Sequence, residues 1–337
     1  MRRAIALGLS AMLISGIAVA LALVWSWRQL NTALVLPEEG IFFEVRSGTG
    51  LATVTAELER LGVIRHSWIL NAYASAEGSA RRIQAGEYQL LPGLSSLDLL
   101  AKLGRGDVYL HRFTVIEGWR TAELIRRLRA HPAIAAGTLS AAEIMDELGK
   151  PDVHPEGQFL PDTYSFPRGM RDVEFLALAH EALETVLDEA WAERTDTVLR
   201  SPYEGLILAS IIEKETALAS ERGLISGVFH ERLKRGMRLQ TDPTVIYGLG
   251  DAYDGNLTSA NLAADTPYNT YTRRGLPPSP IALAGRAAIV AAFSPVETAA
   301  LYFVATGEPD GSHAFSATLE EHNAAVARYL ARQRAGN

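Results

Sequence analysis

The stretch Leu206-Ile-Leu-Ala-Ser-Ile-Ile-Glu213-Lys-Glu215-Thr216 places two glutamates behind seven uncharged residues, six of which are apolar. Such a run predicts a helix buried on most sides, and carboxylates rarely lie against apolar surface without a partner or a function. Burial raises the pKa of a carboxyl group and keeps it protonated near neutral pH, as a general acid requires. The alternative is that the buried helix ends at Ile212 and that both glutamates reach water. The spacing alone does not decide which glutamate is the acid.

The N-terminal segment predicts a membrane anchor. Residues 4–27 carry no charge, and a helix of that length spans about 36 Å, which is enough to cross a hydrocarbon core with some tilt. Trp25 and Trp27 stand where an interfacial aromatic belt would lie, and Arg2 and Arg3 favour a cytoplasmic N-terminus. We therefore expect a single membrane span.

The alternative for this segment is a cleaved signal peptide, because Ala18-Val19-Ala20 resembles a small-residue cleavage site. The apolar run is longer than a usual signal core, which favours an uncleaved anchor. In both cases the chain after Arg28 is exported.

Removing Arg2 and Arg3 from the net charge of −7 leaves −9, which argues against a nucleic-acid partner. The absence of cysteine excludes disulfides and thiolate sites, so stability must come from packed cores.

A unit consisting of a strand-like segment, a glycine and a helix-like stretch occurs three times between residues 40 and 130. An apolar residue stands six and ten positions after each glycine, and this (i, i+4) pair marks one buried helix face. The glycine supplies the turn out of the strand. The units resemble LysM-like modules, which bind N-acetylglucosamine polymers; a structural α/β module without a ligand is the alternative. The glycines with their apolar pairs are Gly48 with Val54 and Leu58, Gly93 with Leu99 and Leu103, and Gly118 with Leu124 and Leu128.

The rest of the chain predicts a less repetitive mixture of elements. Residues 172–198 show the periodic apolar side of a helix. Residues 151–169 are rich in proline, aspartate and aromatic residues and predict an ordered loop. Residues 301–305 predict a strand that is followed by a turn. The expected fold class is therefore α+β.

Several classes of catalytic site are absent from the sequence. It contains no Gly-x-x-x-x-Gly-Lys-[Ser/Thr] loop, no His-Glu-x-x-His motif and no Gly-x-Ser-x-Gly elbow. The eight histidines are scattered, and the spacing of nine between His313 and His322 is a poor zinc signal. We therefore expect neither a metal ion nor a cofactor.

What remains is a set of carboxylates among polar and aromatic residues, the usual composition of a carbohydrate cleft. Each segment taken singly is more often a structural turn, but four such segments occur together in this chain. They are Glu156-Gly-Gln-Phe-Leu-Pro-Asp-Thr-Tyr164, Arg238-Leu-Gln-Thr-Asp-Pro-Thr244, Tyr268-Asn-Thr-Tyr271 and Gly275-Leu-Pro-Pro-Ser-Pro280.

Longer motifs resemble the endolytic murein transglycosylase family (MltG, formerly YceG-like) over nearly the whole chain. Family members resemble one another in having an N-terminal membrane helix, a LysM-like subdomain and a catalytic domain that faces the cell wall. The resemblance implies an anchor at residues 1–28, a small LysM-like α/β subdomain at residues 40–112 and a mixed α+β catalytic domain at residues 113–337. Ser279 departs from the family pattern, which usually has glycine there. The motifs are Ala209-Ser-Ile-Ile-Glu-Lys-Glu-Thr216, Phe229-His-Glu-Arg-Leu233, Met237-Arg-Leu-Gln-Thr-Asp-Pro-Thr-Val-Ile-Tyr-Gly248, Tyr268-Asn-Thr-Tyr271, Gly275-Leu-Pro-Pro278, Glu156-Gly157, Pro161-Asp-Thr-Tyr164, Leu301-Tyr-Phe-Val304, His313-Ala-Phe-Ser316 and Glu321-His-Asn323.

The resemblance implies that Glu213, rather than Glu215, is the catalytic acid, because the family's essential glutamate takes the first position of Glu-Lys-Glu. It also implies a lytic reaction on peptidoglycan. One carboxyl protonates the oxygen between N-acetylmuramic acid and N-acetylglucosamine, then takes the proton of the muramyl C6 hydroxyl and leaves a 1,6-anhydro end. The candidates for holding the sugars and orienting the acid are Glu156, Gln240, Thr241, Asp242, Asn269 and Tyr271.

Two alternatives remain at this point. An ordinary glycosidase uses two carboxylates, so Asp242 or Glu156 would serve a hydrolytic muramidase as the second one. In a non-catalytic scaffold that binds the wall, the repeated units would hold glycan and Glu213 would only end a helix.

The expected partners are peptidoglycan glycan strands and, through the N-terminal helix, the membrane; nucleic acid is not expected. The tether would hold the site near the membrane, where glycan strands are polymerised, and the resemblance implies a role in setting strand length. Peptidoglycan synthases are therefore expected neighbours. The expected location is the bacterial inner (cytoplasmic) membrane, crossed once, with the catalytic domain in the periplasm.

Overall fold

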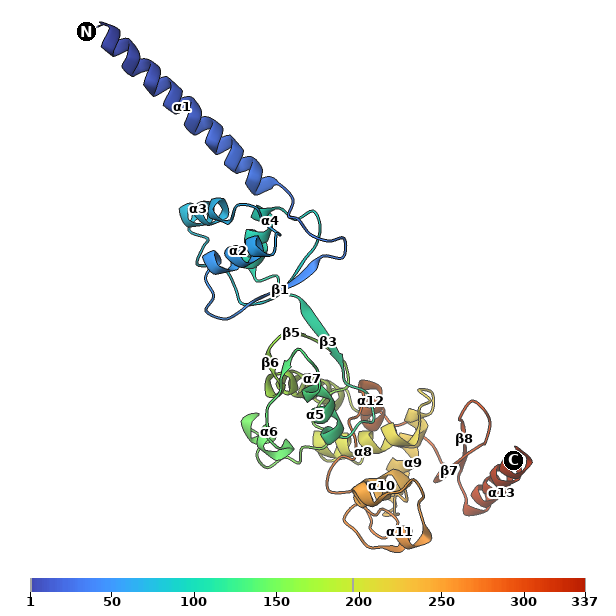
Figure 1. Ribbon diagram of the computed structural model, residues 1–337. Helices are drawn as coiled ribbons and strands as arrows, with labels where there is room; N and C mark the ends of the chain where they lie inside the picture. The colour runs from blue at the N-terminus through green and yellow to red at the C-terminus, as the bar shows by residue number, and fades with distance from the viewer. Residues whose placement is uncertain (1, 196, 337) are drawn as a thin grey trace. The chain divides into compact units, whose positions relative to one another are not determined.

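The computed structural model describes residues 2–195 and 197–336 of the chain (Figure 1). The protein is a mixed α+β protein with an N-terminal apolar helix and small sheets, which confirms the predicted fold class. Its residues form two compact units. Unit 1 comprises the chain up to His111 together with Phe166–Gly169, and unit 2 comprises Arg112–Ser165 and the chain from Met170 onward.

Helix α1 (Arg2–Asn31) carries the predicted anchor. Its segment Leu9–Asn31 is long and apolar enough to cross a membrane, with a mean hydropathy of 2.1, and it fits a single-pass anchor. Leu30 in its last turn and Leu34 just beyond it are buried in the core of unit 1. The helix therefore runs without a break from the apolar segment into a folded core.

Unit 1 is built around an antiparallel pair of strands. Strand β1 pairs with β2 so that Phe43 lies opposite Tyr88, and both rings are buried. One apolar core joins residues of these two strands to residues of the helices around them. The elements after α1 are β1 (Ile41–Val45), α2 (Leu51–Arg60), α3 (Ser67–Glu77), β2 (Gly86–Leu90), α4 (Ser96–Arg105) and β3 (Leu110–Thr114), whose last residues belong to unit 2.

The three predicted strand–glycine–helix units are present. Each glycine has a positive φ, between 76° and 94°, and therefore turns the chain as only glycine does without strain. The strand–helix pairs are β1 with α2, β2 with α4, and β3 with α5 (Thr121–Arg129). All six apolar positions are at most 1% exposed: Val54, Leu58, Leu99, Leu103, Leu124 and Leu128. The predicted helix faces are thus confirmed.

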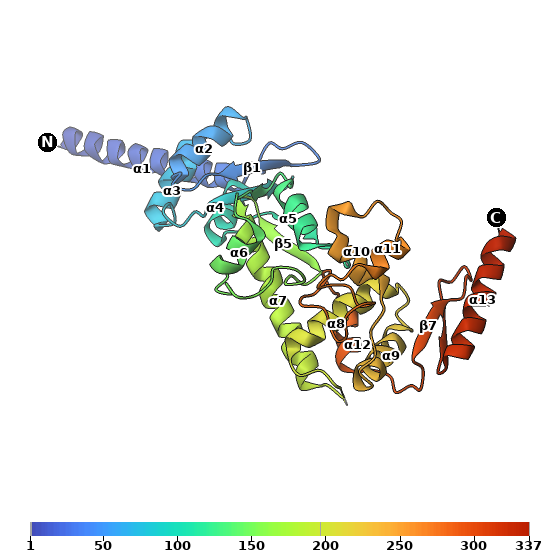
Figure 2. The same ribbon diagram turned by 90° about the horizontal axis from the view of Figure 1, so that it is seen from below.

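Unit 2 is mainly helical, and its strands are short. Strand β3 pairs with β5, β4 pairs in parallel with β6, and β7 pairs antiparallel with β8. Helix α13 packs on the β7–β8 pair (Figure 2), and β7 confirms the strand predicted at residues 301–305. The elements after α5 are β4 (Ile134–Ala135), α6 (Ala141–Glu147), β5 (Thr163–Pro167), β6 (Met170–Arg171), α7 (Asp172–Ala192), α8 (Pro202–Glu215), α9 (Arg222–Lys234), α10 (Asp242–Leu249), η1 (Gly250–Ala252), α11 (Ser259–Ala263), α12 (Arg286–Phe293), β7 (Tyr302–Ala305), β8 (His313–Ser316) and α13 (Leu319–Gly336).

The helix predicted at residues 172–198 is shorter than expected, because α7 ends at Ala192. The residues that follow are polar and offer no further apolar face. The backbone N–H of Thr195 donates to the carbonyl oxygen of Phe293 at 3.1 Å, so a long-range contact replaces the next helical turn.

The loop predicted at residues 151–169 contains a strand, β5, that the sequence reading missed. Its partner β3 lies about 50 residues earlier in the chain. Phe166 in β5 is completely buried. A short strand of this kind is stabilised by its partner and its buried ring, neither of which local composition reveals.

Helix α8 crosses the core of unit 2, and its residues 205–212 are all buried. Gly205 permits close contact with α12, since a Cβ atom there would lie 1.9 Å from the ring atom Cζ of Phe293. The helix continues through Glu215, and the side chain of Glu213 is only 7% exposed. The alternative in which the helix ends at Ile212 and both glutamates reach water is therefore wrong.

Candidate active site

The two glutamates at the end of α8 face different parts of unit 2. Two positions along an α-helix correspond to a rotation of about 200° around its axis. The carboxyl group of Glu213 accepts a hydrogen bond from the backbone N–H of Gly285, with Oε2 and N 3.0 Å apart. The carboxyl group of Glu215 accepts one from the hydroxyl group of Thr241. The structure thus gives the two side chains different partners, whereas their spacing in the sequence did not distinguish them.

Burial raises the pKa of the Glu213 carboxyl above its ordinary value. The hydrogen bond from Gly285 opposes this rise, the nearby carboxylate of Glu117 adds to it, and the cations of Arg222 and Lys214 oppose it. The guanidinium Nη2 of Arg222 lies 3.9 Å from Glu213 Oε1, beyond hydrogen-bond distance. Glu213 therefore holds a proton at a higher pH than an exposed glutamate does.

The segment that contacts Glu213, residues 281–285, is fixed on α8 at two points. The backbone N–H of Ile281 donates to Ser210 Oγ at 3.0 Å, one helical turn before the contact of Gly285 with Glu213. The loop that carries Glu117 lies against the same segment, because Gly118 and Leu283 are joined by a 2.8 Å backbone hydrogen bond. A Cβ atom at position 285 would lie 1.8 Å from Glu117 Oε1, so any larger residue there would have to displace the Glu117 carboxyl.

The Glu215 carboxyl is also largely removed from water. Burial raises the pKa of its carboxyl to about 7. The hydrogen bond from Thr241 opposes the rise, the Asp242 carboxylate adds to it, and the positive charges of His313 and Arg232 oppose it. This second carboxyl with a raised pKa contacts the turn before α10 through Thr241.

Helix α10 begins at a turn that is joined to the segment around Thr270. The backbone N–H of Gln240 donates to the carbonyl oxygen of Thr270 at 3.2 Å, and that of Thr241 donates to Thr270 Oγ1 at 3.0 Å. The hydroxyl group of Tyr271 donates to Asp242 Oδ1 at 2.5 Å. Four of the predicted sugar-binding residues therefore lie together beside the C-terminal end of α8.

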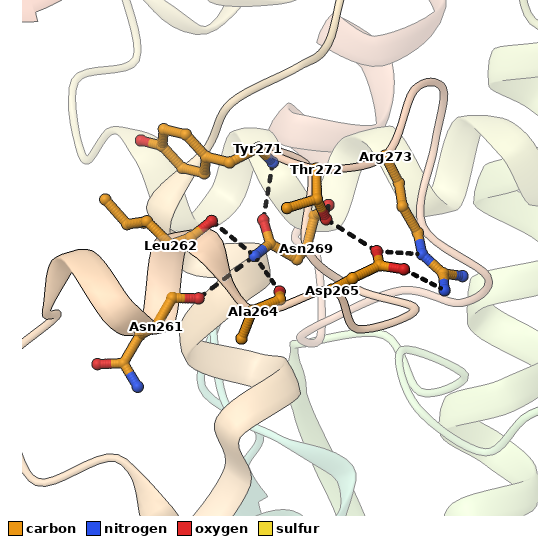
Figure 3. A network of polar contacts seen from close by, with 8 residues as sticks. All are labelled: Asn261, Leu262, Ala264, Asp265, Asn269, Tyr271, Thr272 and Arg273. Carbon is orange, nitrogen blue, oxygen red and sulfur yellow. Dashed lines mark hydrogen bonds and ion pairs between the residues drawn. The ribbon is translucent and has the colours of Figure 1, made fainter.

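Asn269 belongs to the same segment, but its amide group is occupied by backbone (Figure 3). Its Nδ2 donates to three backbone carbonyl oxygens at 2.6 to 3.3 Å, and its Oδ1 accepts from the backbone N–H of Tyr271 at 2.8 Å. The residue is 1% exposed. The three carbonyls belong to Asn261, Leu262 and Ala264. Asn269 thus fixes the loop before it and has no free amide hydrogen bond to offer.

Glu156 is also buried and engaged. Its Oε1 accepts from the backbone N–H of Thr121 at 2.8 Å, which satisfies a free donor at the start of α5. Burial raises the pKa of this carboxyl, and hydrogen bonds from Thr121 and Tyr247 oppose the rise. The ring of Tyr247 packs edge-to-face on Tyr268, whose hydroxyl group is 2.7 Å from Ser279 Oγ. Ser279 thus ties the proline-rich loop to the rings beside Glu156.

Three residues around Glu213 could not be predicted from the sequence: Glu117, Arg222 and Gly285. Glu117 and Gly285 are 96 and 72 residues from Glu213, and no local pattern marks such contacts. Arg222 opens the helix that follows α8, and its charge at a helix start, where acidic residues are preferred, is the one available signal. Within the described residues, no group of three or more His, Asp or Glu side chains is arranged to hold a metal ion.

Known proteins resemble this chain over most of its length. The model of the YceG-like family matches residues 43–328. A Bacillus subtilis protein named endolytic murein transglycosylase is 32% identical over 305 residues, which cover 85% of this chain and 84% of the relative. A Streptococcus pneumoniae protein of the same name is 26% identical, and the match covers 85% of this chain but 58% of that protein.

A solved structure shares the fold. The crystal structure of a YceG-like protein from Listeria monocytogenes is 28% identical, with a TM-score of 0.55, and the match covers 86% of this chain and 99% of that one. The chain therefore belongs to the YceG-like family.

Proposed function

We propose that this protein is an endolytic lytic transglycosylase that cuts peptidoglycan glycan strands between N-acetylmuramic acid and N-acetylglucosamine. The observation that carries the proposal is the Glu213 carboxyl, a buried acid with a raised pKa at the end of α8 in a chain of the YceG-like family. Its relatives are named endolytic murein transglycosylases.

Glu213 suits this role better than Glu215. Only Oε2 of Glu213 accepts a hydrogen bond among the described residues, so Gly285 orients the carboxyl while Oε1 is left to carry the proton. The Glu215 carboxyl also accepts one hydrogen bond, but its donor is the hydroxyl group of Thr241, which is only 2% exposed, so this carboxyl is directed at the buried side of the turn before α10. An acid must be held in place and still have an oxygen free for the substrate.

The proposed reaction needs one carboxyl group. Protonated Glu213 donates its proton to the glycosidic oxygen as the bond from C1 to that oxygen breaks, and N-acetylglucosamine leaves with a new hydroxyl group. The Glu213 carboxylate then takes the proton of the muramyl C6 hydroxyl while O6 bonds to C1. The product is a 1,6-anhydro end, Glu213 is protonated again, and no water is consumed. The buried Glu156 is engaged with Thr121 and Tyr247, which disfavours it as a second catalytic carboxylate.

The other predicted residues divide into two groups under this proposal. Gln240 in the turn before α10 and Asp242, the first residue of that helix, are exposed and offer polar groups to the sugars, together with Tyr271. Asn269, Glu156 and the buried Thr241 act indirectly, because their hydrogen bonds shape the loops around the site. Residues 40–112 would form the LysM-like subdomain and residues 113–337 the catalytic domain. Periplasmic orientation at the inner membrane and neighbouring peptidoglycan synthases belong to the same proposal.

The test is digestion of purified peptidoglycan by the full chain in detergent, with the products analysed by mass. Lytic products lack the water that hydrolytic products contain. We expect anhydro ends from the wild type and from Glu181→Gln, a control on the exposed face of α7, and none from Glu213→Gln. Water-containing ends alone, or full cleavage by a folded Glu213→Gln variant, would overturn the proposal.

A further inference from the structure

Glu215 is a buried carboxyl that the proposed reaction does not use. It lies two positions after Glu213, on another side of α8, and its Oε1 accepts a hydrogen bond from the Thr241 hydroxyl. Thr241 is 2% exposed, so this contact lies inside the protein. The charged and titratable groups around Glu215 are Asp242, His313, Arg232 and Tyr271.

The turn that Glu215 contacts is strained. Gln240 has a φ of 52° and is the only described residue other than glycine with a positive φ. Side chains seldom adopt this conformation, and it persists where surrounding contacts enforce it, often at functional sites. Here the contacts are the hydrogen bonds from Gln240 and Thr241 to Thr270, and that from Thr241 to Glu215.

The strained turn alternates buried and exposed residues. Thr241 points inward, whereas Gln240 and Asp242 on either side of it are exposed. The carbonyl oxygen of Thr241 also accepts from Thr244 Oγ1 at 2.8 Å, so the inward residue is held through its backbone as well. Fixing Thr241 therefore fixes the backbone positions from which Gln240 and Asp242 reach solvent.

We infer that Glu215 is a positioning residue for substrate binding: by holding Thr241, it sets Gln240 and Asp242 as a polar rim for the glycan beside the end of α8. This inference rests on the proposed function. It assigns the two glutamates of Glu-Lys-Glu separate tasks, with Glu213 acting on the bond that breaks and Glu215 acting through the turn.

The test compares three variants of the full chain in detergent on uncrosslinked glycan strands. Glu215→Gln keeps an oxygen that accepts from Thr241, so we expect a KM near that of the wild type. Glu215→Ala and the nearly isosteric Thr241→Val each lose the hydrogen bond, and we expect KM to rise about tenfold with kcat little changed. A double variant that combines Glu215→Ala with Thr241→Val should be no worse than either single variant, because both changes remove the same contact.

Circular dichroism shows whether each variant is folded. If Glu215→Ala unfolds, the KM of Thr241→Val decides the test. A folded Thr241→Val variant with the KM of the wild type would overturn the inference. So would a loss confined to kcat, because Glu215 would then act on the chemistry. The affinity of Glu213→Gln for glycan, measured with and without the additional change Thr241→Val, tests the polar rim in the absence of cleavage. If the wild type does not cleave glycan, only the proposed function is refuted.

Discussion

The Glu215 carboxyl should make the stability of the protein depend on pH. Its pKa is about 7 in the folded state, compared with an ordinary value of 4.5. The folded protein therefore binds this proton more tightly than the unfolded chain does. The contribution of Glu215 to the free energy of unfolding is greatest below about pH 4.5, falls as the pH rises towards 7, and is then constant. A difference of about 2.5 pK units corresponds to about 3 kcal/mol, which is an upper bound because the residue keeps some exposure to water.

Urea unfolding of the full chain in detergent at pH 5 and pH 8, followed by tryptophan fluorescence, measures this loss. Most of the interval lies between these two values, so the wild type should lose up to about 2.5 kcal/mol more than Glu215→Gln on going to pH 8. Glutamine keeps the acceptor for Thr241 but cannot ionise. Glu181→Gln, on an exposed surface, should change in parallel with the wild type. Equal losses in the wild type and in Glu215→Gln would show that ionisation of Glu215 does not cause the loss.

Three further changes test other parts of unit 2. Gly205→Ala should destabilise the protein by about 3 kcal/mol in urea unfolding, because the new methyl group meets the buried ring of Phe293; an unchanged midpoint would show that α8 and α12 are not so close. Asn269→Ala should cost about 2 kcal/mol and speed limited proteolysis near residues 261–264, since three carbonyls lose their donor. Arg222→Gln removes a charge that lowers the pKa of Glu213, so the alkaline limb of the pH–rate profile should move to higher pH, and a shift to lower pH would contradict this.

Local periodicity was sufficient to predict the helices that bury one face. The glycine followed by apolar residues six and ten positions later located α2, α4 and α5, because a glycine turn and an (i, i+4) pair are both encoded within one short segment. The same holds for α8, whose uncharged and mostly apolar run predicts burial on most sides. The fold class followed from these elements.

The surroundings of the candidate acid could not be predicted in this way. The sequence offered Glu213 and Glu215 as equals, and they differ only because Gly285 and Thr241 reach them from other segments. Asn269 was expected to hold sugar, yet its polar atoms are directed to backbone. Side-chain type predicts that a group will need hydrogen-bond partners, but tertiary packing decides which partners it receives.

If α1 spans a membrane, this continuous helix sets both the distance of the unit 1 core from the membrane and the direction in which that core faces. Leu30 and Leu34 are fixed in its core, so no flexible joint separates that core from the apolar segment of the helix. Each residue inserted into the segment would lift unit 1 by about 1.5 Å and rotate it by about 100° around the helix axis. Two inserted residues would add little height but would turn its outward face almost to the opposite direction.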